Sequence, residues 1–518
     1  MTFEIVFVLL SLLGMVAALI ADKMRPGMIL FSVVVLFLCA GILTPKEMLE
    51  GFSNKGMITV ALLFLVSEGI RQSGTLGQVI KKLLPQGKTT VFKAQLRILP
   101  SVAFISAFLN NTPVVVIFAP IIKHWAKSVN LPATKFLIPL SYVTILGGIC
   151  TLIGTSTNLV VHGMILEAGF EGFSMFELGK VGIFIAIAGI IYIFLFSSLN
   201  VFCRMHVRMA VPDEEVEEGE KLHRVEAVLG ARFPGINKKL KDFNFQRHYG
   251  AEVKEIKTRN GQRFVTNLDD VVLHEGDTLV VMADDTFIPT WGESSVFVLL
   301  TNGNEPDTSG KKKRWFALLL LVLMIVGATV GELPVTKEMF PDIKLDMFFF
   351  VSITTIIMAW TNLFPARKYT KYISWDILIT IACAFAISKA MVNSGVADSV
   401  AKFIIGLSDD YGPHVLLAMV FIITNLFTEL ITNNAAAALA FPLALSISAQ
   451  LGVSPTPFFV VICMAASASF STPIGYQTNL IVQGIGNYKF TDFVRIGLPL
   501  NIITFLISVI LIPLIWNF

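Results

Sequence analysis

Two polar segments of this chain are near copies of each other. Residues 151–161 read TLIGTSTNLVV and residues 472–482 read TPIGYQTNLIV, so the copies lie 472 − 151 = 321 residues apart. In each copy, hydroxyl and amide side chains surround a glycine, Gly154 or Gly475, within apolar sequence. A helix that unwinds at such a place exposes carbonyl oxygens, which suit Na⁺, and electropositive helix N-termini, which suit an anion. The two segments therefore predict a pair of unwound helices that bind ions.

Two further polar clusters lie inside apolar segments that are predicted to enter the membrane and turn back. Residues 91–125 carry Asn110, Asn111 and Thr112, and residues 413–450 carry Thr432, Asn433 and Asn434. Asparagine and threonine each offer both a donor and an acceptor. Such hairpin tips can hold a doubly charged oxyanion through hydrogen bonds, with bound Na⁺ offsetting its charge.

Other polar residues within apolar sequence have plainer interpretations. Polar side chains in membrane helices often only join neighbouring helices, and this interpretation suits the isolated Asn362 and His162. Glu68 is expected near the cytoplasmic end of its helix, with a proton or cation site as the alternative. Glu429 is expected to support the second hairpin, with a proton or cation site as the alternative. The duplicated clusters are different. Polar, unwound backbone is costly inside a membrane, so its presence at equivalent places in both copies indicates a common function.

The composition predicts an all-α membrane protein. The chain has 518 residues, of which 54% are hydrophobic and only 15% charged, whereas a soluble domain is about 25% charged. Its long apolar runs approach the roughly 20 residues that cross a bilayer as helix: Ile5–Ala21, Met28–Leu43, Val181–Val201, Trp315–Val330, Met347–Leu363 and Leu498–Ile515. The net charge of +3 gives no indication of nucleic-acid binding, and the five cysteines lack metal-ligand spacing.

The duplication extends beyond the polar segments and predicts the topology. Residues 58–74 match residues 379–395 at the same 321-residue spacing. Basic loops, such as residues 81–97, are assigned to the cytoplasm, and acidic loops, such as residues 167–177, to the outside. Each half, residues 1–210 and 311–518, then has five crossings and one re-entrant hairpin. Because five is odd, the second half is inverted relative to the first, and both chain ends are external.

A polar segment, residues 211–310, separates the halves and is expected in the cytoplasm. Three pieces read as strands, residues 225–229, 251–257 and 278–283, and residues 236–243 read as a helix, which together predict a small α/β module. The pattern Leu273-x-Glu275-Gly276-Asp277-Thr278-Leu279 lies in a stretch, about 222–287, that resembles a TrkA-C (RCK C-terminal) domain. The resemblance implies a small regulatory ligand, often a nucleotide, or a role in dimerisation. An insert that only helps assembly is the alternative.

The second polar segment resembles the signature of a known family. Residues 467–482 contain Ser467-x-x-Phe470-x-x-Pro473-Ile474-Gly475-x-x-x-Asn479-x-Ile481-Val482, a pattern similar to that of the divalent anion:sodium symporters, which transport sulfate or dicarboxylates. The resemblance covers both membrane halves. It implies a homodimer in the cell membrane that works by an elevator mechanism, with Na⁺ as coupling ion and no organic cofactor.

The resemblance also implies roles for individual residues. The anion is expected at Asn110, Asn111, Thr112, Ser156, Thr432, Asn433, Asn434, Thr472 and Pro473. Sodium is expected, partly through backbone carbonyls, at Thr112, Gly154, Thr155, Asn158, Asn434, Gly475 and Asn479. The family carries Ser-Asn-Thr at both tips, whereas here Asn110, Thr432 and Asn434 depart from that pattern.

These observations predict a sodium-coupled importer of a small divalent oxyanion. Sulfate is favoured, because the altered tips weaken a dicarboxylate assignment and the TrkA-C-like insert resembles the sulfate-type branch. A di- or tricarboxylate transporter, an exchanger or efflux permease, and a channel or ligand sensor are the alternatives. An enzyme is not expected, since the sequence shows no Ser/His/Asp constellation, no His/Cys metal set and no phosphate-binding glycine loop.

Overall fold

The computed structural model covers most of the chain. It describes residues 3–518 apart from 22–23, 86, 88, 199–222, 231–232, 259–261, 285–286, 288–290, 292–295, 302–310, 341–342, 407–411 and 487. The acidic part of the predicted linker, residues 213–220, lies outside the described residues.

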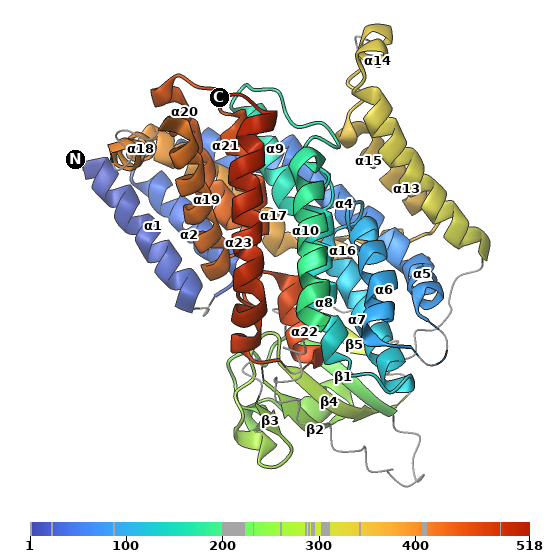
Figure 1. Cartoon of the computed structure of the whole chain (residues 1–518). Coiled ribbons are helices and arrows are strands. Elements are labelled where there is room, and N and C mark those ends of the chain that lie inside the picture. The colour runs from blue at the N-terminus through green and yellow to red at the C-terminus, as the bar shows by residue number, and fades with distance from the viewer. Residues whose placement is uncertain are drawn as a thin grey trace.

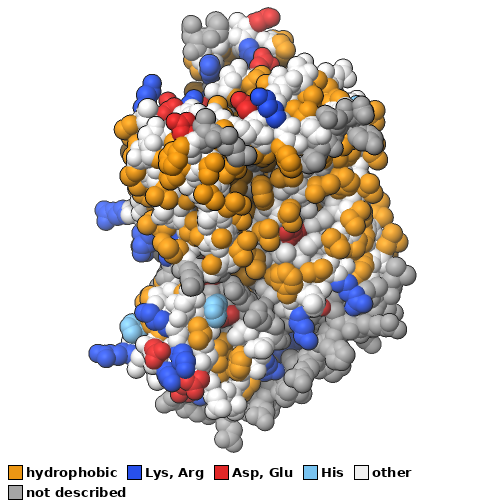
Figure 2. Space-filling view, turned by 90° about the vertical axis from the view of Figure 1, so that its left-hand side faces the viewer, with side chains coloured by type: hydrophobic (Ala, Val, Ile, Leu, Met, Phe, Trp, Pro, Cys, Tyr) orange, Lys and Arg blue, Asp and Glu red, His pale blue; other side chains and the backbone are white. Residues whose placement is uncertain are grey.

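The protein is mostly helical, as the composition predicts, and it is built to cross a membrane. Among the described residues, eight helical segments are long and apolar enough to span a bilayer: Phe3–Ala21, Pro45–Gln72, Gly179–Ser197, Lys311–Gly331, Trp375–Asn393, Gly412–Leu430, Asn433–Leu451 and Phe490–Ile515. Apolar side chains cover a broad band of the surface between two more polar ends (Figure 2). A soluble protein would bury such a band, so the multi-pass membrane architecture follows from the exposed surface as well as from helix length.

The helices of the first half follow one another with short connections (Figure 1). Thr44 and Glu47 form a capping box that starts α3, and Gly74, with φ of 69°, lets the chain turn between α4 and α5. The elements are α1 (Phe3–Ala21), α2 (Pro26–Cys39), α3 (Pro45–Glu50), α4 (Lys55–Gln72), α5 (Thr75–Leu83), α6 (Val91–Ser106), α7 (Asn111–Ser128), α8 (Thr134–Gly148), α9 (Ser156–Glu167) and α10 (Gly179–Ser198).

The second half has a corresponding order of helices. These are α13 (Lys311–Gly331), α14 (Pro334–Met339), α15 (Met347–Trp360), α16 (Tyr369–Tyr372), α17 (Trp375–Asn393), α18 (Val396–Gly406), α19 (Gly412–Leu430), α20 (Asn433–Leu451), α21 (Thr456–Ser467), α22 (Gln477–Gly486) and α23 (Phe490–Ile515). α2 and α15 both begin and end 321 residues apart, since 347 − 26 = 360 − 39 = 321. For this pair of helices, the spacing read from the sequence is also the spacing of the helix boundaries.

Each half contains a helix–turn–helix with its polar cluster at the turn. Hairpin 1 is α6 and α7 with the tip at residues 107–110, and hairpin 2 is α19 and α20 with the tip at residues 431–432. Both turns fall where the sequence predicts them. In Figure 1 the lower ends of α6 and α7 lie on the side of the β-sheet, whereas α18 and the top of α20 lie on the side of the two termini.

The segment between the halves forms a five-stranded antiparallel sheet in the order β3-β2-β4-β1-β5. Its strands are β1 (His223–Leu229), β2 (Glu252–Lys257), β3 (Arg263–Phe264), β4 (Thr278–Ala283) and β5 (Phe297–Thr301). The three predicted strands correspond to β1, β2 and β4. The sheet extends past residue 287, where the resemblance ends, because β5 pairs with β1.

The predicted helix over residues 236–243 is wrong. Only a short 3₁₀ turn, Leu240–Asp242, forms there. The backbone of this stretch pairs instead with residues 271–273: Asn237 N donates to Leu273 O at 2.7 Å and Leu240 N donates to Val271 O at 3.0 Å. Asn237 also has a φ of 61°, which an α-helix does not allow. Long-range backbone pairing overrides the local helical preference.

Candidate functional site

Both repeated polar segments are unwound. α8 ends at Gly148 and α9 begins at Ser156, and α21 ends at Ser467 and α22 begins at Gln477. The predicted breaks around Gly154 and Gly475 are therefore confirmed. A Cβ on Gly154 would lie 2.4 Å from Gly148 O, and one on Gly475 would lie 2.0 Å from Ser469 Oγ and 2.4 Å from Thr428 O. Glycine is thus needed in both segments because other groups approach its Cα closely.

The two unwound segments share a set of hydrogen bonds. The hydroxyl of Thr151 accepts from Gly154 N at 3.2 Å, and that of Thr472 accepts from Gly475 N at 3.2 Å. The amide nitrogen of Asn158 donates to Thr151 O at 2.9 Å, and that of Asn479 donates to Thr472 O at 3.1 Å. Each Thr–Asn pair therefore ties the unwound backbone to the following helix. The Thr hydroxyls and the Asn amide nitrogens are thus already bonded within the protein in both segments.

Each hairpin tip contacts the helix that begins in the opposite half of the chain. Thr112 Oγ1 donates to Gln477 Oε1 at 3.2 Å. Asn434 Oδ1 accepts from Ser156 Oγ at 3.3 Å and from Thr157 Oγ1 at 3.2 Å. Four helices, α7, α20, α9 and α22, begin at or next to these residues. Because helix N-termini carry unpaired N–H groups and partial positive charge, their meeting point suits an anion.

Tyr476 lies at the centre of this arrangement, and the sequence reasoning missed it. Its buried hydroxyl lies 2.9 Å from Thr155 Oγ1, which is the equivalent position of the first copy since 476 − 155 = 321. The amide of Asn111 is satisfied when its nitrogen faces Ser106 Oγ and Thr144 O, at 2.8 and 3.0 Å, and its oxygen accepts from the Tyr476 hydroxyl at 2.6 Å. The sequence did contain a signal for Tyr476. At this position the first copy has the small hydroxyl residue Thr155, whereas the second copy has a large one.

Two of the predicted site residues have a buried side-chain oxygen that lacks a hydrogen-bond partner in the described part of the chain. Asn158 is fully buried, and among the described residues its Oδ1 has no hydrogen-bond partner. The equivalent oxygen of Asn479 accepts from Ser141 Oγ at 2.7 Å. Thr432 Oγ1, at the tip of hairpin 2, also lacks a partner within the described part of the chain. A buried polar atom without a partner is costly, so these two oxygens are the best candidates for binding an ion or substrate.

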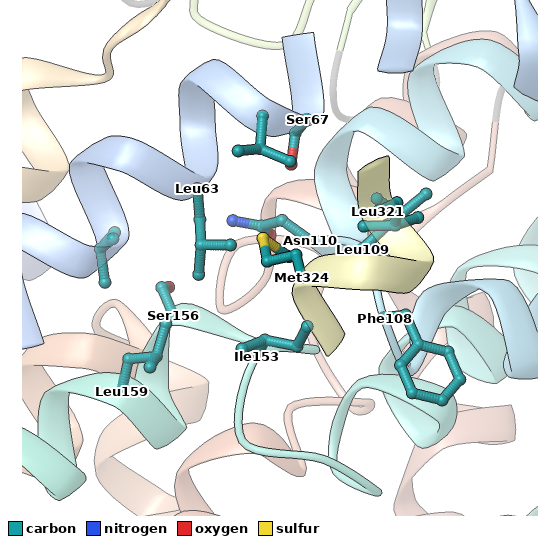
Figure 3. A pocket seen from close by; sticks show the side chains of 12 residues that line it. Leu63, Ser67, Phe108, Leu109, Asn110, Ile153, Ser156, Leu159, Leu321 and Met324 are labelled. Atoms are coloured by element: carbon teal, nitrogen blue, oxygen red, sulfur yellow. The ribbon is translucent and has the colours of Figure 1, made fainter. Parts of the chain in front are cut away.

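The first tip faces a very small cavity. A pocket of about 10 Å³, which is room for about one water molecule, lies between α4, the first unwound segment and α13. Figure 3 shows Asn110 pointing into it beside Leu63 and Met324, with Ser156 and Leu159 at its edge. Of the predicted anion-binding residues, Asn110 and Ser156 line this pocket.

A much larger vestibule begins on the other side of Leu159, which lines both cavities. It has a volume of about 1200 Å³ and is lined by residues of α4, α9, α14 and α15, which places it on the side opposite the sheet (Figure 1). Its charged lining is mixed and includes Glu50, Lys55, Glu167, Glu332, Lys337 and Asp346. Lys55 and Asp346 form an ion pair across it, between the start of α4 and the start of α15.

Thr472 and Glu429 make contacts that hold hairpin 2 and the second unwound segment together. Pro473 is buried in the second unwound segment, and the hydroxyl of Thr472 donates to Glu429 O at 3.1 Å. The carboxylate of Glu429 accepts from Ser471 N at 2.8 Å and from Asn501 Nδ2 at 2.7 Å. Glu429 therefore joins hairpin 2 to the unwound segment and to α23, in keeping with a supporting role.

Glu68 and His162 lie away from the tips. Glu68 forms an ion pair with Arg71 at 2.7 Å on the same helix. His162 lines the vestibule, and a Cβ on Gly172 would lie 2.3 Å from its ring, so the ring packs tightly against that loop. Neither side chain is brought to the tips by the fold.

Comparison with known proteins identifies the family of this site. A family model described as "Citrate transporter" (CitMHS) matches residues 16–446 and 343–518. The chain belongs to this family. Among relatives, an uncharacterized transporter of Synechocystis is 29% identical over 94% of this chain and 93% of its own length. The uncharacterized transporter YfbS of Escherichia coli is 25% identical over 99% of this chain and 100% of its own.

Another relative of this CitMHS member has a name that includes a cation, sodium, and an anion, sulfate. Sodium/sulfate cotransporter 2 of Chlamydomonas reinhardtii is 31% identical over 54% of this chain, a region that makes up 31% of that relative. The names of these relatives and of the family all describe transport. The protein is therefore a multi-pass membrane transporter with sodium/sulfate cotransporter homologues.

Proposed function

We propose that this CitMHS transporter carries out sodium-coupled symport of a small divalent oxyanion, most favourably sulfate. The observation that carries the proposal is the meeting of four helix N-termini with amide and hydroxyl side chains at one place. N–H groups and hydroxyls can bind a dianion without a basic side chain, provided that cations offset its charge. The free oxygens of Asn158 and Thr432 are suitable ligands for those cations.

Sulfate is favoured over a carboxylate by the chemistry of the tips and by the relatives. The tips depart from the Ser-Asn-Thr pattern at Asn110, Thr432 and Asn434, and Tyr476 bonds to Asn111 beside the first tip and to Thr155. Relatives named as sodium/sulfate cotransporters support the same choice. The family name points to citrate, so a sodium-coupled di- or tricarboxylate transporter is the alternative. An exchanger is the third possibility, for which the carboxylate of Glu429 would have to carry a proton.

The proposed mechanism is alternating access by an elevator motion of two inverted repeats. The hydrogen bond between equivalent residues, Thr155 and Tyr476, is what a local two-fold axis through the site would produce. The crossed contacts of Thr112 with Gln477 and of Asn434 with Ser156 support the same symmetry. In this proposal the hairpins approach the membrane centre from opposite sides, each half has five crossings, and the vestibule is the external entrance.

The remaining assignments form part of the same proposal. The transporter is placed in the cell membrane as a homodimer, with the sheet on the cytoplasmic side. The sheet is proposed to be a TrkA-C-like domain, for which a small regulatory ligand such as a nucleotide is the candidate partner.

Uptake into proteoliposomes tests the function. Purified protein is given radiolabelled sulfate, succinate or citrate, with and without an inward Na⁺ gradient. We expect saturable sulfate uptake that requires Na⁺. Strong succinate or citrate uptake without sulfate uptake would refute the substrate, and uptake of any anion that is indifferent to Na⁺ would refute the coupling. Flux that does not saturate would point to a channel.

A further inference from the structure

The β-sheet of the insert packs directly on the helices that form the candidate site. In Figure 1 it lies beneath α7, α8 and α22. Val228 of β1 is 1% exposed and belongs to the same hydrophobic cluster as the membrane helices. The contact is therefore a packed apolar interface rather than a loose attachment through linkers.

One part of this interface is a turn that fits against α22. We call residues 274–277 the docking turn. Its shape is fixed by His274 N, which donates to Asp277 Oδ2 at 2.7 Å, and by Gly276 N, which donates to Leu229 O at 2.9 Å. Gly276 has a φ of 84°, and a Cβ there would lie 2.7 Å from Leu480 Cδ1. Glycine is thus required both by the backbone conformation and by the closeness of α22.

α22 has its own glycine at the same contact. Gly484 lies one helical turn after Leu480, on the same face. A Cβ on Gly484 would lie 2.7 Å from Thr278 Oγ1 and 3.0 Å from Gly276 O. The helix and the docking turn therefore approach each other as closely as backbones allow. Leu480 directly follows Asn479, so this contact is one residue away from a predicted sodium ligand.

A second part of the interface is an ion pair with hairpin 1. Lys123 of α7 donates to both carboxylate oxygens of Glu226 in β1, at 2.9 and 2.7 Å, and Lys257 of β2 donates to the same carboxylate at 3.2 Å. The side chains of Glu226 and Lys257 are 18% and 13% exposed. Charges that are this shielded hold their positions firmly, because separating them would leave a poorly solvated charge. α7 begins at Asn111, about 18 Å from Lys123 along the helix.

We propose that the cytoplasmic sheet is a rigid part of the ion-binding unit, which fixes α22 through the docking turn and α7 through Glu226 and thereby sets the affinity of the site for Na⁺. Both helices begin at the site and end on the sheet, so a tilt of either helix at the sheet moves its first turn. Anything that shifts the sheet, such as a ligand or a partner, changes the affinity for Na⁺ by the same route. The proposal rests on the sodium coupling proposed above.

Variants of the ion pair test the effect on affinity. Glu226→Gln and Lys123→Met remove the attraction, whereas Lys123→Arg keeps it. The Na⁺ concentration for half-maximal thermal stabilisation and for half-maximal uptake is measured for each. We expect an increase of about fivefold or more for the first two variants, and a value near that of the unmodified protein for Lys123→Arg. Glu252→Gln is the matched control, because Glu252 pairs with Lys254 on the exposed part of the sheet.

The result that overturns the proposal is an unchanged Na⁺ requirement in folded Glu226→Gln and Lys123→Met protein. If these variants do not fold, the Na⁺ requirement of Leu480→Ala tests the same coupling, because this variant loosens the contact between α22 and the docking turn. A protein whose unmodified form shows no response to Na⁺ refutes the sodium coupling instead, so the two failures are distinguishable.

A disulfide tests whether the sheet stays attached during transport. Thr278→Cys and Gly484→Cys are introduced together into a chain whose five native cysteines are replaced, because a Cβ on residue 484 would lie 2.7 Å from the position of Thr278 Oγ1. Uptake by the reduced double variant is the baseline, since the added Cβ also crowds Gly276 O. If the sheet is a rigid part of the moving unit, uptake continues after oxidation. Uptake that stops on oxidation and returns with reductant would show that the sheet must detach, and would overturn the proposal.

Discussion

Removal of the Tyr476 hydroxyl is the sharpest test of the candidate site. This hydroxyl joins hairpin 1, through Asn111 at 2.6 Å, to the first unwound segment, through Thr155 at 2.9 Å. Each hydrogen bond contributes about 1 kcal/mol net, and the Asn111 oxygen, left buried without a partner, adds about 1 to 3 kcal/mol. The two hydrogen bonds alone, about 2 kcal/mol, correspond to roughly a 30-fold change in an equilibrium constant.

We therefore expect Tyr476→Phe to raise the KM for the anion by about 30-fold or more. Without the hydroxyl, the tip of hairpin 1 is no longer held in place before the anion binds. Part of the binding free energy is then used to position it. The measurement is sulfate uptake as a function of sulfate concentration at saturating Na⁺. Thr155→Ala removes one of the same two hydrogen bonds, so its effect and that of Tyr476→Phe should not add in the double variant.

Tyr488→Phe is the matched control for this experiment. The hydroxyl of Tyr488 is also buried, but it donates to Thr134 O, at the end of α8 that is remote from the unwound segment after Gly148. Its loss should lower the melting temperature and leave the KM unchanged. A KM for Tyr476→Phe within twofold of the unmodified value, in a protein that folds, would refute the assignment of this hydroxyl to the site.

Three other predictions follow from the same contacts. Burial alone would raise the pKa of Glu226, but two lysines hold this pKa at about 2, below its usual 4.5. The ionised carboxylate therefore stabilises the folded protein above about pH 5, and this contribution is lost as the pH falls toward 2. Glu226→Gln should flatten an acid-unfolding curve followed by tryptophan fluorescence. Gly475→Ala places a methyl group 2.0 Å from Ser469 Oγ and should abolish Na⁺-driven uptake in protein that still reaches the membrane. Glu429→Gln should keep Na⁺-driven uptake, since the carboxylate is bonded structurally; loss of a pH-dependent flux would instead favour an exchanger.

The polar parts of the site were predictable because polar groups are expensive inside a membrane. The breaks at Gly154 and Gly475 and the tips at Asn111 and Asn433 all stand out against apolar sequence, and the duplication shows that they belong together. Tyr476 was not predictable in the same way, because an aromatic residue within apolar membrane sequence usually indicates packing. Only its distances to Thr155 and Asn111 reveal a role in the site.

The contacts of the insert show where sequence patterns stop being informative. The strands follow from their alternation and β-branched residues, but the false helix over residues 236–243 arose because pairing with residues 271–273 is not visible locally. The contact between Gly276 and Leu480 joins residues from two parts of the chain that share no motif. Glycines such as Gly484 hint at close approach, but the sequence does not say to what.

The hydrogen bond between Thr155 and Tyr476 has a consequence for how the protein could have arisen. These residues hold the same place in the two copies, so an ancestor made of two identical half-length subunits would have presented the same side chain from both sides. Such an ancestor could not offer its cargo a short alcohol on one side and a phenol on the other. In the single chain the two positions are independent, so a short alcohol can stand on one side of the site and a phenol on the other.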